Sequence, residues 1–208
     1  MNSILLIDKP SGITSFDVIR RLRQKLGIRK MGHAGTLDPL ATGLLIIGLE
    51  KATKELAAYM GLPKEYEVLV EFGKVSTTYD AQGELRMMND ELQDVSREDF
   101  EKILKNFIGE IDQTPPQFSA IRVKGKRAYD LARRGEKVEL ASRKVRIDSI
   151  EILDWNWPFV SLRVKCGKGT YIRSLAHDIG QKIECGGYVK ELRRTAIGDF
   201  RVENAQQL

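Results

Sequence analysis

The chain has 208 residues, of which 42% are hydrophobic and 30% charged, and its formal net charge is +5. This composition is typical of a folded globular protein and excludes a disordered one. No apolar run approaches the roughly 20 residues that a membrane-spanning helix needs, and residues 1–8 lack the basic start of a signal peptide. We therefore expect a cytoplasmic protein with no membrane partner.

The few cysteines and histidines limit the metal and disulfide chemistry that the sequence predicts. Cys166 and Cys185 do not form a C-x-x-C pair, and His33 and His177 are the only histidines. A disulfide framework and a four-ligand zinc site are therefore not expected. Both thiols are typical of small buried apolar residues, and we expect neither a metal nor a cofactor.

Positive charge is concentrated in one segment. Residues 122–146 hold ten Lys or Arg against three carboxylates, a net charge of +7, which leaves −2 of the total +5 for the rest of the chain. A basic segment on a near-neutral body indicates a polyanionic partner. The alternative is a lysine-rich helix face exposed to water.

The first half of the chain alternates strands and helices. A short buried strand is predicted over 4–7 and a turn over 8–12. A helix then begins at a cap on Thr14 or Ser15 and ends at Gly27, with four residues on its apolar face (Phe16, Ile19, Leu22, Leu26). We further predict a strand over 44–49, a helix over about 52–60, a half-buried strand over 66–72 and a polar turn over 77–83.

The second half begins with an amphipathic helix opened by Ser96 and closed by Gly109, with Phe100, Ile103, Leu104 and Phe107 on its apolar face. Two prolines mark 113–117 as a loop. We predict a short helix over 128–134, strands over 145–153 and 159–166, a helix over 171–183, and a last segment at 200–202. Strands interspersed with separate helices favour a single α+β domain on a mixed, mostly antiparallel sheet.

One carboxylate stands in an unusually constrained turn. Asp38 lies between Gly32 and Gly43, next to Pro39, and an apolar run follows. An ionised aspartate can act as a nucleophile without a base. It would need partial desolvation, which raises its pKa, and a cation to hold it charged. Taken alone, an aspartate at this position more often has an ordinary turn or capping role.

Arg173 is the candidate for that cation. It follows the glycine-rich segment 167–169 and falls in the first turns of the helix predicted over 171–183. An arginine can bind a carboxylate through two parallel hydrogen bonds, which a lysine cannot do.

Eight stretches, in order, resemble the TruB family of tRNA pseudouridine synthases. They are 8–15 (DKPSGITS), 32–43 (GHAGTLDPLATG), 64–66 (KEY), 80–83 (DAQG), 113–120 (QTPPQFSA), 125–129 (GKRAY), 167–175 (GKGTYIRSL) and 192–195 (LRRT) with Gly198 and Phe200. Each stretch alone is weak, but eight in the family's order make a specific resemblance.

The resemblance implies the pseudouridine synthase fold and isomerisation of uridine to pseudouridine at position 55 of the tRNA T-loop, without cofactor or metal. Asp38 matches the family's nucleophile, which attacks either the uracil ring or the ribose C1′. Arg173 matches its paired arginine. Tyr66 matches the tyrosine that stacks on the target base and is implicated in the later proton removal. The uridine must leave the RNA stack to be reached.

Further residues are assigned by the same resemblance. His33 matches a histidine that inserts near the vacated position in the RNA. Lys9 belongs to a turn facing the site and is a candidate RNA contact. Leu192 matches an apolar position lining the base pocket, although an ordinary core leucine would also fit this position.

The basic segment matches a thumb-like insertion, about residues 114–146, that closes over the RNA loop. Its candidate RNA contacts are Lys124, Lys126, Arg127 and Tyr129, cations for phosphates and a ring for stacking. Arg122 stands where the family more often has lysine. Many bacterial relatives continue past Phe200 into a PUA-type module, whereas this chain stops at Leu208, so we expect weaker binding to the acceptor-stem side of tRNA.

The sequence is therefore compatible with three functions. The first is a stand-alone, monomeric enzyme that acts on the tRNA T-stem-loop. The second is the catalytic subunit of a guide-RNA-dependent pseudouridylation particle, against which the missing PUA domain argues. The third is an RNA-binding protein with a silent site, against which the presence of Asp38, Tyr66 and Arg173 argues. A nuclease or deaminase is excluded because the sequence lacks the metal or zinc ligands that these enzymes use.

Overall fold

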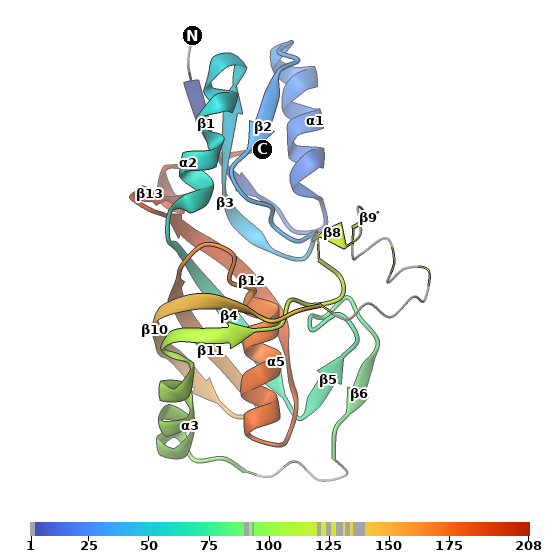
Figure 1. The fold of residues 1–208 in the computed structure, drawn as a ribbon, viewed down its shortest axis with the longest axis vertical. Coiled ribbons are helices and arrows are strands. Elements are labelled where there is room, and N and C mark those ends of the chain that lie inside the picture. Colours follow the sequence, from blue (N-terminus) through green and yellow to red (C-terminus); the bar gives the residue numbers. More distant parts are fainter. Residues whose placement is uncertain are drawn as a thin grey trace.

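The computed structural model describes residues 3–89, 92, 94–119, 122–123, 126–127, 131, 134 and 140–208. Its main feature is a ten-stranded sheet (Figure 1) with the strand order β14-β1-β3-β12-β4-β11-β10-β7, to which β2 is added on β3 and β13 on β12. Strand pairing is antiparallel except between β1 and β14 and between β3 and β12. The predicted α+β architecture is confirmed.

The elements have the following bounds. The strands of the sheet are β1 (Ser3–Lys9), β2 (Met31–His33), β3 (Thr42–Leu49), β4 (Lys64–Phe72), β7 (Gly109–Gln113), β10 (Arg143–Asn156), β11 (Phe159–Cys166), β12 (Gly187–Ile197), β13 (Phe200–Arg201) and β14 (Gln206–Gln207). Two separate hairpins are β5 (Lys74–Ser76) with β6 (Leu85–Met87), and β8 (Arg122–Val123) with β9 (Lys126–Arg127). The α-helices are α1 (Ser15–Leu26), α2 (Leu56–Gly61), α3 (Arg97–Leu104) and α5 (Ile172–Lys182), and short 3₁₀ turns are η1 (Glu50–Lys54), η2 (Lys105–Phe107) and η3 (Val202–Asn204).

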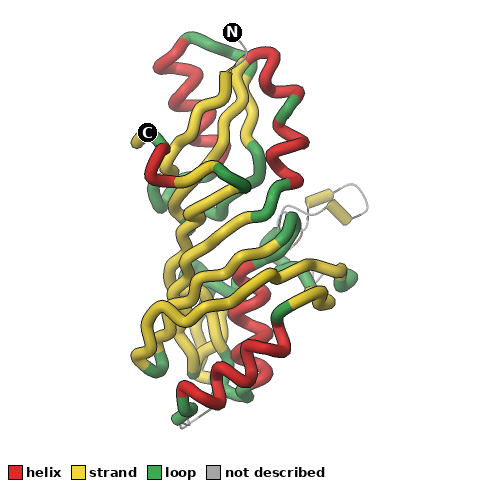
Figure 2. Tube along the Cα trace, turned by 90° about the vertical axis from the view of Figure 1, so that its left-hand side faces the viewer, coloured by secondary structure: helices red, strands yellow, loops and turns green. Residues whose placement is uncertain are grey.

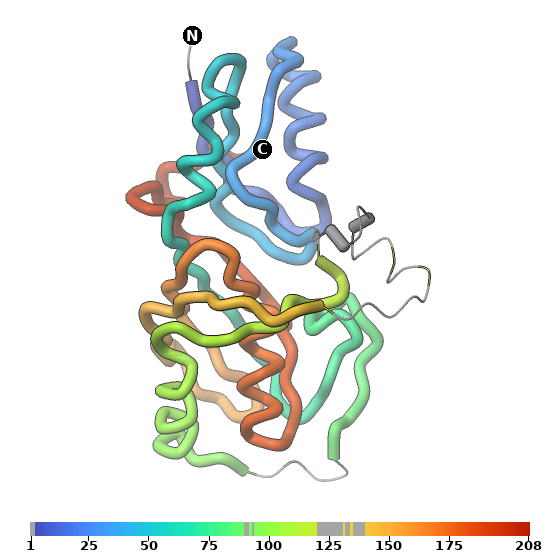
Figure 3. Tube along the Cα trace, in the orientation of Figure 1, coloured from blue at the N-terminus to red at the C-terminus, as the bar shows by residue number. Residues whose placement is uncertain are grey.

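Strand β3 is buried on both faces. Leu45, Ile47 and Leu49 pack with the α1 residues on one side, while Leu44 and Ile46 pack with α2 on the other. This two-sided burial explains why the strand is a continuous apolar run without alternation. The two ends of the chain lie in this same half of the molecule (Figure 3), where β14 pairs in parallel with β1.

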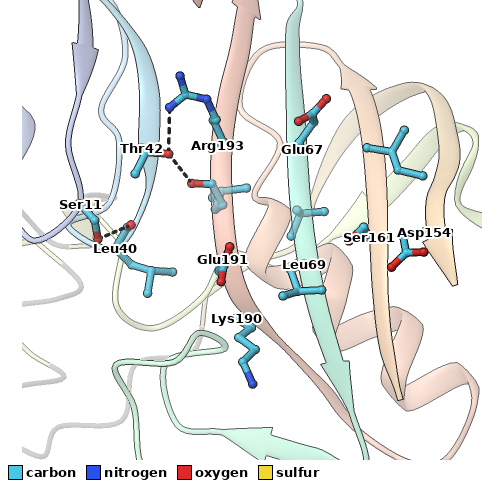
Figure 4. A pocket seen from close by; sticks show the side chains of 13 residues that line it. Ser11, Leu40, Thr42, Glu67, Leu69, Asp154, Ser161, Lys190, Glu191 and Arg193 are labelled. Atoms are coloured by element: carbon cyan, nitrogen blue, oxygen red, sulfur yellow. Dashed lines mark hydrogen bonds between the residues drawn. The ribbon is translucent and has the colours of Figure 1, made fainter. Parts of the chain in front are cut away.

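The other half of the sheet is covered on one face only. Figure 2 shows α3 and α5 on the same side, where Leu175 and Ile179 of α5 and Phe100 of α3 pack with Val70 and Phe72 of β4. The opposite face of β4, β10, β11 and β12 is an open groove of about 650 Å³ (Figure 4). None of the helices within the described ranges is long and apolar enough to span a membrane.

Helix α1 shows both a confirmed prediction and a wrong one. Thr14 caps it through a capping box with Asp17, and Gly27 ends it in the left-handed conformation at φ 69°. The predicted apolar face is right for Ile19 and Leu22 but wrong for Phe16 and Leu26, which are 58% and 44% exposed. The buried face is Ser15, Val18, Ile19 and Leu22. The helix is rotated so that Ser15 faces inward, and the Ser15 hydroxyl forms hydrogen bonds with the Leu37 backbone in the loop that carries Asp38.

Strand β12, one of the central strands, was not predicted from the sequence. It lies between β3 and β4 and carries Leu192, Arg193 and Arg194. Four charged side chains and two register shifts, between Val189 and Glu191 and between Arg194 and Ala196, interrupt the two-residue alternation that identifies a strand.

The other predicted elements agree with the structure within a few residues, with three qualifications. The helix expected to close at Gly109 ends at Leu104 and is followed by the 3₁₀ turn η2, and Gly109 begins β7. The helix expected over 52–60 is a 3₁₀ turn, η1, followed by α2. The end of the basic segment, 143–146, belongs to β10 in the main sheet. The helix expected over 128–134 lies mostly outside the described residues.

Candidate active site

The loop that carries Asp38 connects β2 to β3 and rests on the segment before α1. The Ser15 hydroxyl donates to the Leu37 carbonyl at 3.1 Å and accepts from the Leu37 amide at 2.8 Å. The Gly12 amide donates to the Pro39 carbonyl at 2.8 Å. The stretches 8–15 and 32–43 therefore form one unit, in which backbone hydrogen bonds fix the position of the carboxylate.

Lys9 is fully buried beneath this loop. Its ammonium donates to the carbonyls of Pro10 at 2.9 Å, Ile13 at 2.8 Å and Pro39 at 3.3 Å. Burial lowers the pKa of Lys9 to about 8, although the Asp38 carboxylate opposes the shift. The structure thus places Lys9 as a support of the loop, and the direct RNA contact expected from the resemblance is not available to a side chain with no exposed surface.

Asp38 and Arg173 form an ion pair, although they are 135 residues apart in sequence. Nη2 of Arg173 donates to Oδ1 at 3.1 Å, and Nε lies 2.9 Å from Oδ2 without the alignment of a hydrogen bond. Arg173 is in the first turn of α5, as the sequence predicts, and its side chain is 4% exposed against 34% for Asp38. The cation is therefore fixed inside the protein while the carboxylate remains accessible.

Arg173 has further partners that hold it rigidly. Nη1 donates to the Thr78 carbonyl at 3.0 Å, and Nη2 also donates to the Phe118 carbonyl at 2.9 Å. Nη1 lies 3.5 Å from Oδ2 of Asp80, which is 3% exposed. Asp80 was not among the site residues predicted from the sequence, although the stretch 80–83 contributes to the family resemblance and could have indicated it.

The Asp38 carboxyl has a raised pKa. Burial is the largest cause, and the nearby Asp80 charge raises the pKa further, while Arg173 and Lys9 lower it. This direction agrees with the sequence argument, which required partial desolvation balanced by a cation.

Asp38 and Arg173 line a cavity of about 340 Å³. Tyr66 of β4 and Leu192 of β12 are also in its lining. Tyr66 is 9% exposed, and burial raises the pKa of its phenol. Three more cations line the cavity (Lys64, Arg143, Arg194). An aromatic ring, an apolar side chain and an ion pair around one cavity suit a planar, polar and anion-bearing substrate.

His33 ends β2 and is half-buried, outside the residues that line this cavity. Burial lowers its pKa, and the Arg194 charge lowers it further. Its Nδ1 has no hydrogen-bond partner among the described residues. The ring is therefore neutral near pH 7.

The thumb residues are described only in part. Lys124 and Tyr129 lie outside the described residues. The backbone of Lys126 and Arg127 forms β9, which pairs with β8.

Both cysteines are buried, as predicted, and burial raises the pKa of Cys166 to about 11. Within the described part of the chain, no group of three or more His, Cys, Asp or Glu side chains is arranged to hold a metal ion.

Comparison with known families gives two consecutive matches. Residues 23–172 match the TruB family pseudouridylate synthase (N terminal domain), and residues 173–208 match the tRNA pseudouridylate synthase B C-terminal domain. The tRNA pseudouridine synthase B of Aquifex aeolicus is 48% identical over 210 residues, which cover 100% of this chain and 72% of the relative. That of Phocaeicola vulgatus is 46% identical and covers 97% of this chain and 88% of the relative.

A solved structure supports the same assignment. A chain of a Cbf5-Nop10-Gar1 complex superimposes with a TM-score of 0.77 at 32% identity, covering 99% of this chain and 52% of that one. The present chain thus spans about half the length of this structural relative. From the matched sequence and fold, this chain belongs to the TruB family of tRNA pseudouridine synthases, isomerases that convert uridine in tRNA to pseudouridine.

Proposed function

We propose that this enzyme acts on the T-loop of tRNA, at uridine 55, and uses Asp38 as its nucleophile. The observation that carries the proposal is the Asp38–Arg173 ion pair at the cavity lined by Tyr66 and Leu192. A buried guanidinium keeps the accessible carboxylate charged and oriented, which is what nucleophilic attack requires.

In this proposal the target base leaves the RNA stack and enters the cavity. A glycosidic bond inside a stacked loop is out of reach of Asp38, and flipping a nucleotide costs a few kcal/mol. The flipped uracil would enter the cavity against the Tyr66 ring and the Leu192 side chain. His33, a neutral ring at the end of β2, would occupy the space that the base vacates in the RNA.

The chemistry then follows from the positions of two side chains. Asp38 attacks either the uracil ring or the ribose C1′, and the N1–C1′ glycosidic bond breaks. The base then rejoins C1′ through C5, the bond to Asp38 breaks so that the carboxylate is released, and C5 loses its proton. Tyr66 is the candidate for removal of the C5 proton, because its phenol lies in the same cavity as Asp38. The basic segment, with Lys124, Lys126, Arg127 and Tyr129, would hold the T-stem-loop phosphates. In this proposal a single copy of the chain suffices, without cofactor or metal.

A guide-dependent activity is the alternative that the structural relatives raise. Similar chains occur in a Cbf5-Nop10-Gar1 complex and in an H/ACA RNP bound to a substrate RNA. The higher identity to the tRNA enzymes, 48% against 32%, favours the stand-alone reading.

The test is site mapping without any guide RNA. An unmodified tRNA transcript and a copy with uridine 55 changed to cytidine are incubated with the purified protein. Pseudouridine is then mapped by carbodiimide adducts that stop reverse transcription. We expect one new stop, at position 55, which the cytidine copy lacks. A stop elsewhere would contradict the T-loop assignment, and modification only after addition of a guide RNA would favour the alternative.

A further inference from the structure

Arg194 is the most deeply buried arginine of the described chain, at 1% exposed, and it lies in β12 among the residues that line the catalytic cavity. In the sheet it is paired with Tyr66 of β4 on one side and with Gly43 of β3 on the other. Cross-strand partners place their side chains on the same face of a sheet. One arginine is therefore next to both candidate catalytic segments.

The guanidinium connects the two ends of the loop that carries Asp38. Nε donates to the Leu44 carbonyl at 2.8 Å, after the loop, and Nη2 donates to the Gly35 carbonyl at 3.2 Å, before it. The approach of β12 is so close that a Cβ at Gly43 would overlap the Arg194 backbone. Gly43, at φ 103°, thereby permits the contact that brings Arg194 to the loop.

Arg194 forms no ion pair with any carboxylate of the described residues. A buried charge without a counter-ion is costly, and carbonyl dipoles compensate it only in part. Its field lowers the pKa of Tyr66, against the effect of burial. A neutral side chain of similar size would avoid the desolvation cost of this charge, so we infer that the charge itself has a function.

We propose that Arg194 is a positioning residue for both Asp38 and Tyr66. Its guanidinium fixes the Asp38 loop at both ends and holds a positive charge beside the Tyr66 phenol. The inference rests on the proposed roles of Asp38 and Tyr66. It adds a residue that acts through Asp38 and Tyr66, because its hydrogen bonds go to the backbone on both sides of Asp38.

The neighbouring Arg193 provides a matched control. It is on the same strand but faces the opposite side of the sheet, toward the open groove (Figure 4). There it pairs with Asp8 through contacts of 3.0 and 2.7 Å. It also donates to the Thr42 hydroxyl at 3.3 Å, at the start of β3. Arg193→Met therefore removes an arginine and an ion pair from β12 but leaves the bonds of Arg194 to the Gly35 and Leu44 carbonyls in place.

The test compares Arg194→Met, Arg194→Lys and Arg193→Met with the wild type. For Arg194→Met we expect a single-turnover rate at least 100-fold lower, with the Kd for a T-stem-loop RNA within threefold. Arg194→Lys retains the charge but cannot bridge both carbonyls, so we expect recovery of less than a tenth of the lost rate. Arg193→Met should stay within threefold in rate, even where its thermal midpoint falls.

A second measurement is independent of activity. Amide hydrogen exchange in peptides that cover 34–41 should become at least tenfold faster in Arg194→Met and remain unchanged in Arg193→Met, because the Arg193 side chain forms its only hydrogen bond near the loop, among the described residues, with Thr42. Unchanged exchange, or a rate within fivefold of the wild type, would overturn the proposal. A loss of RNA affinity equal to the loss of rate would make Arg194 a binding residue instead. If the wild type itself forms no pseudouridine, the proposed function fails, and the exchange experiment still decides whether Arg194 fixes the loop.

Discussion

Nη1 of Arg173 lies 3.5 Å from Oδ2 of Asp80, on the far side of the guanidinium from Asp38. Two carboxylates thus share one cation, and both the cation and Asp80 are buried. Asp80 itself accepts hydrogen bonds from the Thr78 hydroxyl at 2.5 Å and from the Gln82 amide at 3.0 Å. The position of Arg173, and through it the orientation of Asp38, depends on this second carboxylate.

Asp80→Asn should therefore lower the single-turnover rate by about 10- to 100-fold, since lost orientation of a reacting group has costs of this size. The RNA Kd should stay within threefold, because Asp80 is buried, with only 3% of its surface exposed. Loss of its negative charge should also move the acid limb of the rate profile to lower pH, because Asp80 raises the pKa of Asp38. Asp154→Asn, an exposed change in β10, is the control, and equal effects of the two changes would contradict the account.

Arg173 should control the pH at which Asp38 becomes active. The rate rises as pH rises through the Asp38 pKa, because the ionised carboxylate is the nucleophile. Arg173 lowers that pKa, so Arg173→Met should shift the acid limb to higher pH. Arg173→Lys keeps a charge and should shift the limb less, but its rate should still fall severely because one ammonium cannot replace the two-point contact. Single-turnover rates between pH 4 and 9 test this, and normal activity of Arg173→Lys would remove Arg173 from the site.

Glu71 should contribute stability that depends on pH. Its buried carboxylate accepts hydrogen bonds from Lys74 at 2.8 Å, Tyr188 at 2.6 Å and Lys190 at 3.0 Å. Although burial alone would raise the pKa of Glu71, these bonds lower it from 4.5 to about 2. The contribution is therefore complete above pH 4.5 and is lost as pH falls toward 2.

Glu71→Gln should accordingly destabilise the protein by about 1–3 kcal/mol at pH 7, the usual cost of breaking buried charged hydrogen bonds. The difference from the wild type in thermal midpoint should shrink between pH 4.5 and 2. Glu84→Gln, in an exposed pair with Arg86, should have little effect at either pH. A midpoint difference for Glu71→Gln that does not vary with pH would show that the carboxylate charge is irrelevant.

Neutralising Lys124, Lys126 and Arg127 together should weaken RNA binding and reduce its salt dependence. Each lost phosphate contact lowers the slope of log K against log salt by about 0.7 to 0.9, so three contacts should reduce it by about 2 to 3. The control neutralises three exposed cations in and just after α3 (Arg97, Lys102, Lys105). An unchanged slope in the thumb variant would mean that this segment does not contact RNA.

The sequence predicted the elements and the central ion pair well, for identifiable reasons. Apolar periodicity with a Thr or Ser cap defined α1 and α3, and periodicity without a cap defined α5. The family resemblance indicated Asp38 and Arg173 together. The prediction of the buried face of α1 was wrong in part because Ser15, a polar residue, faces inward and binds the loop that carries Asp38. Local hydrophobicity carries no sign of that contact.

The missed features share a physical cause. Strand β12 has two bulges and several charged residues, and its burial depends on partners far away in the chain. Lys9 and Arg194 are charged types that are expected at the surface, yet backbone carbonyls from distant loops compensate their burial. Such compensation exists only in the folded chain, so sequence patterns cannot reveal it.

The most direct measurement is tritium release from a T-stem-loop RNA labelled at uridine C5, with the wild type and with Asp38→Asn. Pseudouridine formation exchanges the C5 proton with solvent, so release reports the reaction itself. Our account predicts rapid release by the wild type and none by Asp38→Asn, with RNA affinities within a few fold of each other. Release by Asp38→Asn at a rate near that of the wild type would contradict it.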